Sequence, residues 1–170
     1  MNQAATGAGA GGPAGEPGGN RAVVVIGVGN EFRRDDGAGP EVLARLRDQV
    51  ADNVRLVVSD GEPARLIEAW AGASLALVVD AVRADPVTPG RIHRLVLDQA
   101  GAEHVRPVSS HGLGLGEAIG LARALNLMPD RLIVHAVEAA EFGFGVGLTP
   151  AVAAATDALT SAVLHDLATA

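Results

Sequence analysis

Short apolar runs alternate along the chain with segments whose apolar residues recur at helical spacing. The runs at 22–29, 54–58, 75–82 and 131–137 are rich in Val, Leu, Ile and Ala. They predict strands, and the first and third are continuous enough to be buried on both faces of a sheet. Residues 91–97 alternate apolar and polar side chains, which is typical of a half-exposed or edge strand.

Helical spacing follows most of these runs. Helices are predicted at 40–50, 64–72 and 114–126, and a final helix of about 18 residues begins at Thr149-Pro150, an N-cap followed by a first-turn proline. Strand–helix alternation with short connections implies a three-layer α/β fold. We expect a mostly parallel sheet of about five strands between layers of helices.

The first twenty residues differ from the rest. They consist mainly of Gly, Ala and Pro, a composition that cannot bury enough apolar surface to offset its ordering entropy. We expect residues 1–20 to be a disordered tail, or translation to begin nearer Arg21, and residues 21–170 to form a single domain.

Composition narrows the class of function. The 170 residues carry a net charge of −7, and scattered Arg residues form no basic patch, which argues against nucleic-acid binding. The absence of Cys excludes disulfides, zinc–thiolate sites and a cysteine nucleophile. No apolar stretch reaches the roughly 18 residues of a membrane span, and the start lacks a signal-peptide pattern. We therefore expect a soluble, cytoplasmic protein without membrane partners.

Polar residues follow the predicted strands at points where a parallel sheet gathers its functional groups. They are Asp36, Asp60, Asp80, His111 and Glu138. Several carboxylates at one edge repel one another unless they are protonated or bind a cation. A histidine among them favours a divalent transition metal over Mg²⁺, which prefers oxygen ligands alone. Two carboxylates and one imidazole leave coordination positions free for water or substrate.

Each of these residues also has a structural interpretation. Asp35-Asp36 can cap the helix that begins near Pro40. Asp80 can form a turn at the end of its strand, and Asp60-Gly61 is a favourable turn pair. His111, just before a helix, can be a capping or packing residue.

Two other features remain open to more than one interpretation. His135 lies inside an apolar run and is expected to be a core histidine with its polar atoms satisfied. Phe142 and Phe144 lie in the loop 141–147, one of the loops in which specificity is expected to reside. They either contact the substrate or pack the loop down.

The motifs taken together are more specific than any single residue. In order from about Arg21 to Leu167, the chain resembles the hydrogenase maturation protease family. The resemblance is carried by GVGNEFRRDDGAG (27–39), VSDGEPARLIEAW (58–70), LVVDAV (77–82), SSHGLGLGEAIGLA (109–122) and VEAAEFGFGVGLTP (137–150).

The resemblance implies a twisted sheet sandwiched between helices and a specific activity. Members of that family remove a short C-terminal peptide from the large subunit of a [NiFe]-hydrogenase after nickel has been inserted. By motif position, the nickel-contacting residues are Asp36, Asp80 and His111, and Asp60 is a further catalytic candidate. The Asp-Gly-Gly turn of the family is Asp60-Gly61-Glu62 here, which puts in doubt any role that needs the second glycine.

We therefore expect an endopeptidase that uses carboxylates and acts on a hydrogenase large-subunit precursor, with nickel supplied by the substrate and not bound tightly by the free protein. Asp60 or Glu138 then accepts a proton, and a monomer is favoured. Two alternatives stay open. One is a hydrolase that carries its own Zn²⁺, Mn²⁺ or Mg²⁺. The other is a maturation factor that checks the nickel without cutting.

Overall fold

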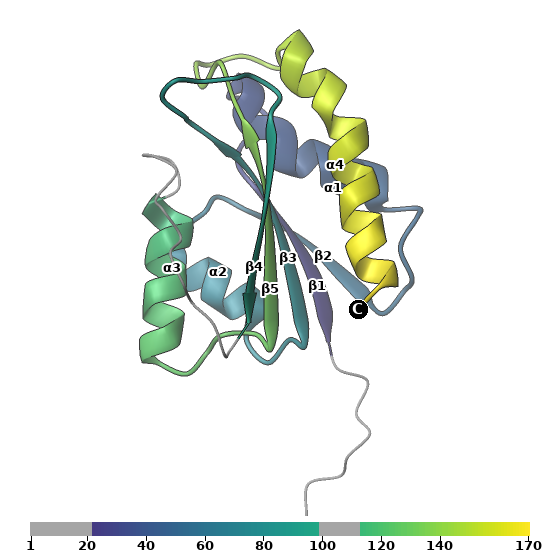
Figure 1. The fold of residues 1–170 in the computed structure, drawn as a ribbon, viewed down its shortest axis with the longest axis vertical. Coiled ribbons are helices and arrows are strands. Elements are labelled where there is room, and N and C mark those ends of the chain that lie inside the picture. The colour runs from purple at the N-terminus through teal and green to yellow at the C-terminus, as the bar shows by residue number, and fades with distance from the viewer. Residues whose placement is uncertain (1–21, 99–112) are drawn as a thin grey trace, which may run out of the picture.

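The computed structural model describes residues 22–98 and 113–170. The expected tail at 1–20 and the candidate ligand His111 lie outside the described residues. In chain order the elements are β1 (Val23–Val28), the 3-10 helix η1 (Arg34–Gly37), α1 (Ala38–Leu46), β2 (Val54–Ser59), α2 (Pro63–Trp70), β3 (Leu75–Val82), β4 (Ile92–Asp98), α3 (Leu113–Ala124), β5 (Arg131–Glu138) and α4 (Pro150–Ala168) (Figure 1).

The five described strands form one mostly parallel sheet. Their order is β2-β1-β3-β5-β4. Strands β1, β2, β3 and β5 run parallel, and β4 pairs antiparallel with β5 at the edge. The predicted fold class and the edge position of the alternating segment are both confirmed. Because four strands run the same way, their carboxyl ends reach one edge of the sheet together.

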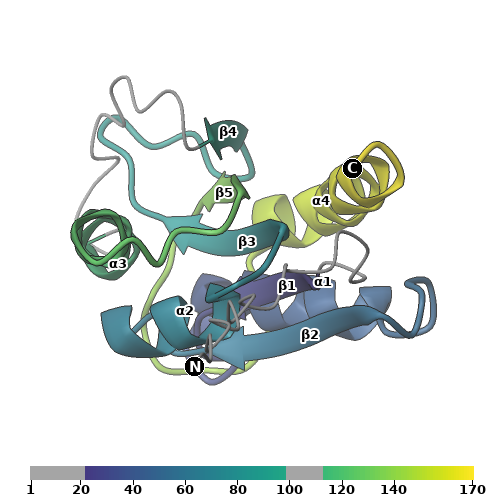
Figure 2. The same cartoon turned by 90° about the horizontal axis from the view of Figure 1, so that it is seen from below.

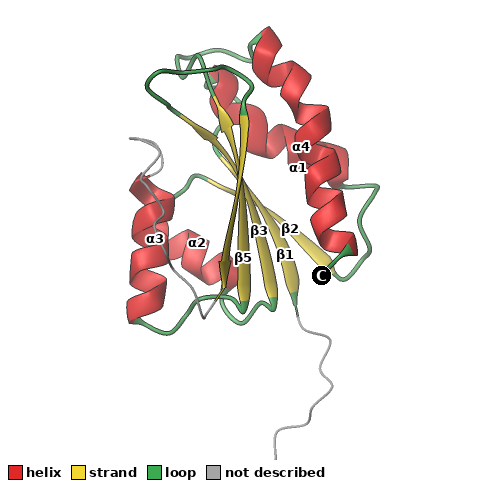
Figure 3. Cartoon of the chain, viewed as in Figure 1, coloured by secondary structure: helices red, strands yellow, loops and turns green. Residues whose placement is uncertain are grey.

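Helices cover both faces of the sheet, as Figures 2 and 3 show. Helices α1 and α4 pack on one face over a core that includes Leu77 and Ile133. Helices α2 and α3 pack on the other over a second core that includes Trp70 and Val78. No helix in the described segments is long and apolar enough to cross a membrane.

The predicted helices exist, but their ends differ by a few residues. Helix α1 stops at Leu46 instead of Val50 because Gln49 and Val50 both donate their N–H groups to the Leu46 carbonyl in a closing turn. Helix α2 begins at Pro63 after an N-cap at Glu62, whose side chain accepts a hydrogen bond from Arg65 N.

The start of α1 lies directly against the centre of the sheet. A Cβ atom on Gly39 would come within 2.4 Å of the Val28 carbonyl oxygen and within 2.8 Å of the Val79 carbonyl oxygen. Only a residue without a side chain permits this approach. The approach brings the segment just before α1, which contains Asp36, over the ends of β1 and β3.

Candidate active site

A pocket of about 380 Å³ opens at the carboxyl ends of the parallel strands. The segments that follow β1 and β2, the end of β3 and the first turn of α3 enclose it. Its lining residues are Val28, Gly29, Arg33, Asp36, Asp60, Gly61, Glu62, Asp80, Gly114 and Leu115. Three of the carboxylates expected at this edge, Asp36, Asp60 and Asp80, therefore border one space.

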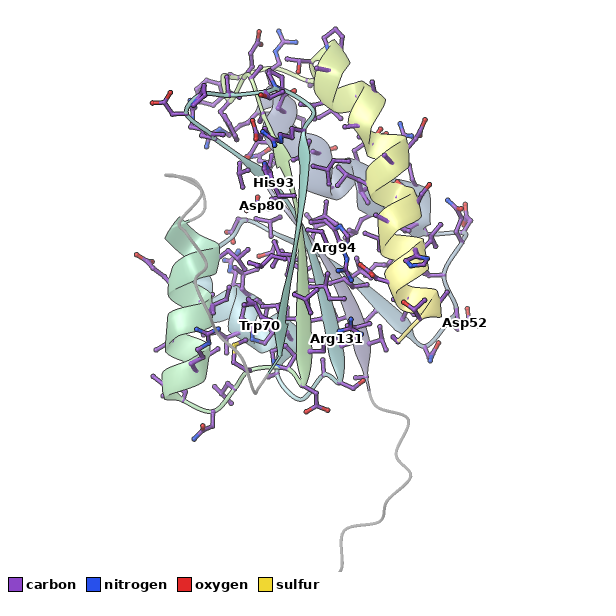
Figure 4. All side chains as sticks on the ribbon, in the orientation of Figure 1. Asp52, Trp70, Asp80, His93, Arg94 and Arg131 are labelled. Atoms are coloured by element: carbon purple, nitrogen blue, oxygen red, sulfur yellow. The ribbon has the colours of Figure 1, made fainter. Side chains whose placement is uncertain are left out.

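Asp36 and Asp80 form the buried acidic part of the pocket. Both side chains are almost fully buried, and Figure 4 shows Asp80 near the end of the sheet where the parallel strands finish. The pKa of Asp80 is raised to about 7, chiefly by burial and to a lesser extent by the nearby charge of Asp36, against the lowering effect of a hydrogen bond from the Ala81 backbone. Within the described residues, no Arg, Lys or His forms a salt bridge with either carboxylate.

The consecutive residues Asp35 and Asp36 have carboxylates with different surroundings. Asp36 accepts a hydrogen bond from Asn30 N at 3.1 Å and faces the pocket. Asp35 is fully buried and accepts four hydrogen bonds from the chain after β5: from Ala140 N, Glu141 N, Thr149 N and Thr149 Oγ1. Neither acid makes a side-chain cap on α1, so the capping interpretation is wrong for both.

Asp60 forms part of the turn after β2 and also borders the pocket. Its carboxylate accepts a hydrogen bond from Glu62 N at 3.2 Å and pairs with Arg65 at 2.9 Å. The turn needs a positive φ at Gly61, which has φ 84°, whereas Glu62 has an ordinary extended backbone with φ −64°. The departure from the Asp-Gly-Gly turn therefore causes no strain, and Glu62 instead caps α2.

The first turn of helix α3 borders the pocket through Gly114 and Leu115. A Cβ on Gly114 would come within 2.2 Å of the Gly61 carbonyl oxygen, so the first turn of α3 lies against the turn that follows β2. His111 lies outside the described residues. The first described residues after it that border the pocket are Gly114 and Leu115.

Glu138 and His135 make their contacts outside this pocket. The Glu138 carboxylate accepts a hydrogen bond from Thr88 N and contacts His93 Nε2 at 2.7 Å, and these contacts hold its pKa below the usual range despite burial. His135 is buried and its Nε2 lies 2.8 Å from Asp166 on α4. The expected core position of His135 is confirmed, but the expectation that its polar atoms are all satisfied is wrong, because Nδ1 has no partner among the described residues.

Sequence reasoning missed Arg33 as a residue of the site. Its side chain borders the pocket and donates a hydrogen bond to the Phe142 carbonyl at 3.3 Å. Phe142 itself is 5% exposed, and the Arg83 guanidinium lies over its ring at 4.4 Å. The only available signal was the position of Arg33 within the motif that contains Asp36.

The donor set for a metal is incomplete among the described residues. No group of three or more His, Asp or Glu side chains there is arranged to hold a metal ion. Asp36 and Asp80 provide two hard oxygen donors, a pair that leaves most positions of a transition metal for other ligands. Among the described residues, the pocket therefore offers two buried carboxylate ligands and no complete metal site.

Comparison with known proteins adds independent information. Residues 40–166 match the family model described as hydrogenase maturation protease. The chain is 28% identical over 149 residues to the hydrogenase expression/formation protein HupD of Rhodobacter capsulatus, covering 85% of this chain and 70% of that protein.

Solved structures share the fold. An endopeptidase from Escherichia coli, determined in solution, is 25% identical with a TM-score of 0.75 and covers 86% of this chain and 91% of that one. The hydrogenase maturating endopeptidase HybD from E. coli gives 24% identity and a TM-score of 0.73 over the same shares of the two chains. Together with the match over most of the chain, these findings place this protein in the hydrogenase maturation protease family, as an endopeptidase.

Proposed function

We propose that the protein removes the C-terminal extension of a [NiFe]-hydrogenase large-subunit precursor after nickel insertion, and that it recognises the nickel held by that precursor. The observation that supports this most is the pair of buried carboxylates, Asp36 and Asp80, at an open pocket without a cationic partner among the described residues. Such a pair is costly in the free protein and becomes favourable when a cation arrives.

The substrate is the natural source of that cation. Two carboxylates together with His111 contribute three ligands, so a nickel ion that keeps part of its coordination from the precursor can bind both molecules at once. Without nickel, the acidic pocket gains no ligand bonds and repels anionic groups. In this proposal, nickel insertion therefore controls access to the pocket.

The chemistry is hydrolysis of one peptide bond. Water adds to the scissile carbonyl carbon, the C–N bond breaks, and the leaving nitrogen departs with a proton. The substrate nickel supplies Lewis-acid activation, while Asp36, Asp80 and His111 fix its position. In this proposal Asp60 accepts a proton, because its residue borders the pocket and its carboxylate, although paired with Arg65, is exposed to solvent. We do not give this role to Glu138, because it is buried, does not border the pocket and has its carboxylate in contact with Thr88 and His93.

Mass spectrometry of a purified large-subunit precursor tests the proposal. After incubation with the protein, the nickel-loaded precursor should lose a C-terminal fragment and the nickel-free precursor should stay intact. Metal analysis of the protein alone should find well under one nickel or zinc per chain. If the purified protein holds about one metal ion per chain and cleaves the precursor whether or not it contains nickel, the result would instead support a hydrolase that carries its own ion.

The role of His111 has a separate test. Replacing His111 by Ala should abolish cleavage of the nickel-loaded precursor while the circular dichroism spectrum and thermal midpoint remain those of the wild type. Unaltered cleavage by this variant would remove the proposed ligand role from His111.

A further inference from the structure

Two loops at the rim of the pocket are joined and carry exposed apolar side chains. Arg33 and Gly145 form an isolated parallel bridge, in which Gly145 N donates to the Phe32 carbonyl and Arg34 N donates to the Gly145 carbonyl, both at 2.9 Å. Phe32 is 61% exposed, Phe144 94% and Val146 71%. We call these three side chains the rim patch.

The backbone that carries the rim patch is firmly held. The buried Asp35 carboxylate fixes Ala140, Glu141 and Thr149 on either side of the loop, and Asp35 N donates to the Glu141 carbonyl at 3.1 Å. Phe142 is packed inward while Phe144 projects outward. The packing interpretation is therefore confirmed for Phe142, whereas Phe144 is exposed to solvent on an ordered loop.

The rim patch is continuous with the pocket through Arg33. That residue follows Phe32 in the chain, takes part in the bridge and borders the pocket beside Asp36. The pocket volume of about 380 Å³ is that of a small-molecule site. Most of a protein substrate therefore has to lie outside the pocket, and the rim patch is carried by the residue before Arg33, which borders the pocket, and by the residues on either side of Gly145.

We propose that the rim patch binds an extended segment of the substrate precursor next to the scissile bond, through apolar side chains of that segment. This inference rests on the proposed function, because it takes the occupant of the pocket to be a polypeptide. Single exposed apolar residues are common on proteins. Three of them on two bridged loops at a pocket rim, two of them Phe, have the composition of the centre of a binding surface.

The rim patch should contribute to binding and not to the chemical step. In the double variant F32A/F144A, KM for the nickel-loaded precursor should rise about tenfold or more while kcat stays within about twofold, because these side chains contact the substrate equally in the ground and transition states. F144L keeps part of the apolar surface and should fall between wild type and F144A.

A matched control is available on the far side of the molecule. Leu125 is an exposed apolar residue after the end of α3, where the chain returns to the start of β5, and L125A should leave KM unchanged. Because Phe32 and Phe144 are exposed, all variants should keep the wild-type thermal midpoint. If the wild-type protein cleaves the precursor and F32A/F144A has the same KM as wild type, the rim-patch proposal is overturned and the proposed function stands.

A direct binding measurement can test the rim patch even if the protein does not cleave the precursor. If the wild-type protein binds the purified precursor without cutting it and F32A/F144A loses that binding, the proposed cleavage fails and the rim patch stands. If neither cutting nor binding occurs, both fail. A wild-type dimer in light scattering that F32A/F144A converts to monomer, with an unchanged KM, would assign the patch to a second copy of this chain and overturn the proposal.

Discussion

Three neighbouring carboxylates show how strongly the surroundings of a residue decide its task. Asp35 accepts four hydrogen bonds and holds a loop, and Asp36, one residue later, faces the pocket. Asp80 is buried beside Asp36 and has a pKa raised to about 7. The residue type is identical in all three cases, and the difference lies in the N–H groups and charges around each carboxylate.

Asp80 should make the free protein less stable as the pH rises. Its pKa is about 7 in the folded protein against 3.8 without burial, so the folded state holds a proton that the unfolded state releases between these values. The stabilisation from that proton is complete below pH 3.8 and is lost as the pH rises through 7. D80N, which stays neutral, should match the wild type near pH 4 and exceed its free energy of unfolding by up to about 4 kcal/mol at pH 8.

Denaturant unfolding of metal-free protein at several pH values measures this difference. A constant gap between D80N and wild type from pH 4 to pH 8 would show that Asp80 ionises as an ordinary exposed carboxylate. E68Q on α2 is a suitable control, because Glu68 is exposed and should give no such pH dependence.

At the scale of elements, close contacts between backbones determine where helices α1 and α3 lie relative to the pocket. Helix α1 touches the sheet at Gly39, and α3 touches the turn after β2 at Gly114. Periodicity predicted both helices, but the contact surfaces depend on which glycines face a neighbour. Of the glycines in α3, Gly114 lies against Gly61, whereas Gly116 and Gly120 have open space where a Cβ would be.

Two alanine substitutions in α3 should therefore have opposite effects. G114A places a Cβ where the Gly61 carbonyl lies, so the helix has to shift, and both stability and cleavage should fall. G120A adds a Cβ in open space and should raise the free energy of unfolding by about 0.5–1 kcal/mol through helix propensity, with normal cleavage. Thermal unfolding and precursor cleavage measure both, and a G114A variant as stable and active as G120A would contradict the packing of α3 on this turn.

The C-terminal helix α4 makes polar contacts with strands β4 and β5. Asp166 on α4 is buried, pairs with Arg94 on β4 through two hydrogen bonds of 2.7 and 3.0 Å, and also contacts His135. Figure 4 shows Arg94 directed from the sheet toward α4. These contacts join the antiparallel edge strand and β5 to the helix that covers them.

Removing the carboxylate at this position should be costly. D166A leaves buried His135 without its partner and Arg94 without its ion pair, so the free energy of unfolding should fall by about 2 kcal/mol or more. D157A on the same helix removes an exposed partner of Arg45 and should change it by less than about 0.5 kcal/mol. Equal losses in the two variants, measured by denaturant unfolding, would contradict the structural role of the Asp166 contacts.

At the scale of the whole molecule, the sequence predicts the architecture well because periodicity reflects burial. The run 75–82 coincides with a strand buried along its full length, and the alternation at 91–97 coincides with the edge strand β4. The 3-10 helix η1 was not predicted, since it depends on contacts with the distant loop near Gly145 and on a positive φ of 54° at Arg34.

The candidate site could be predicted only in part. The rule that functional groups gather at strand ends led to Asp36, Asp60 and Asp80, and the structure places all three at one pocket. The same rule led to Glu138, yet its carboxylate contacts His93 on the neighbouring strand β4 and Thr88 in the loop before that strand, contacts that depend on β4 pairing antiparallel with β5. The opposite orientations of Phe142 and Phe144 likewise depend on tertiary contacts that no local pattern records.

In the proposed function, Asp36 and Asp80 bind nickel brought by the precursor. The most direct test is kcat/KM for cleavage of nickel-loaded and nickel-free precursor by wild type, D36N, D80N and, as an exposed-carboxylate control, D157N. We predict nickel-dependent cleavage by wild type and D157N, and a loss of at least about 100-fold in D36N and D80N. Wild-type cleavage of the nickel-free precursor, or full activity in D36N and D80N, would contradict the account.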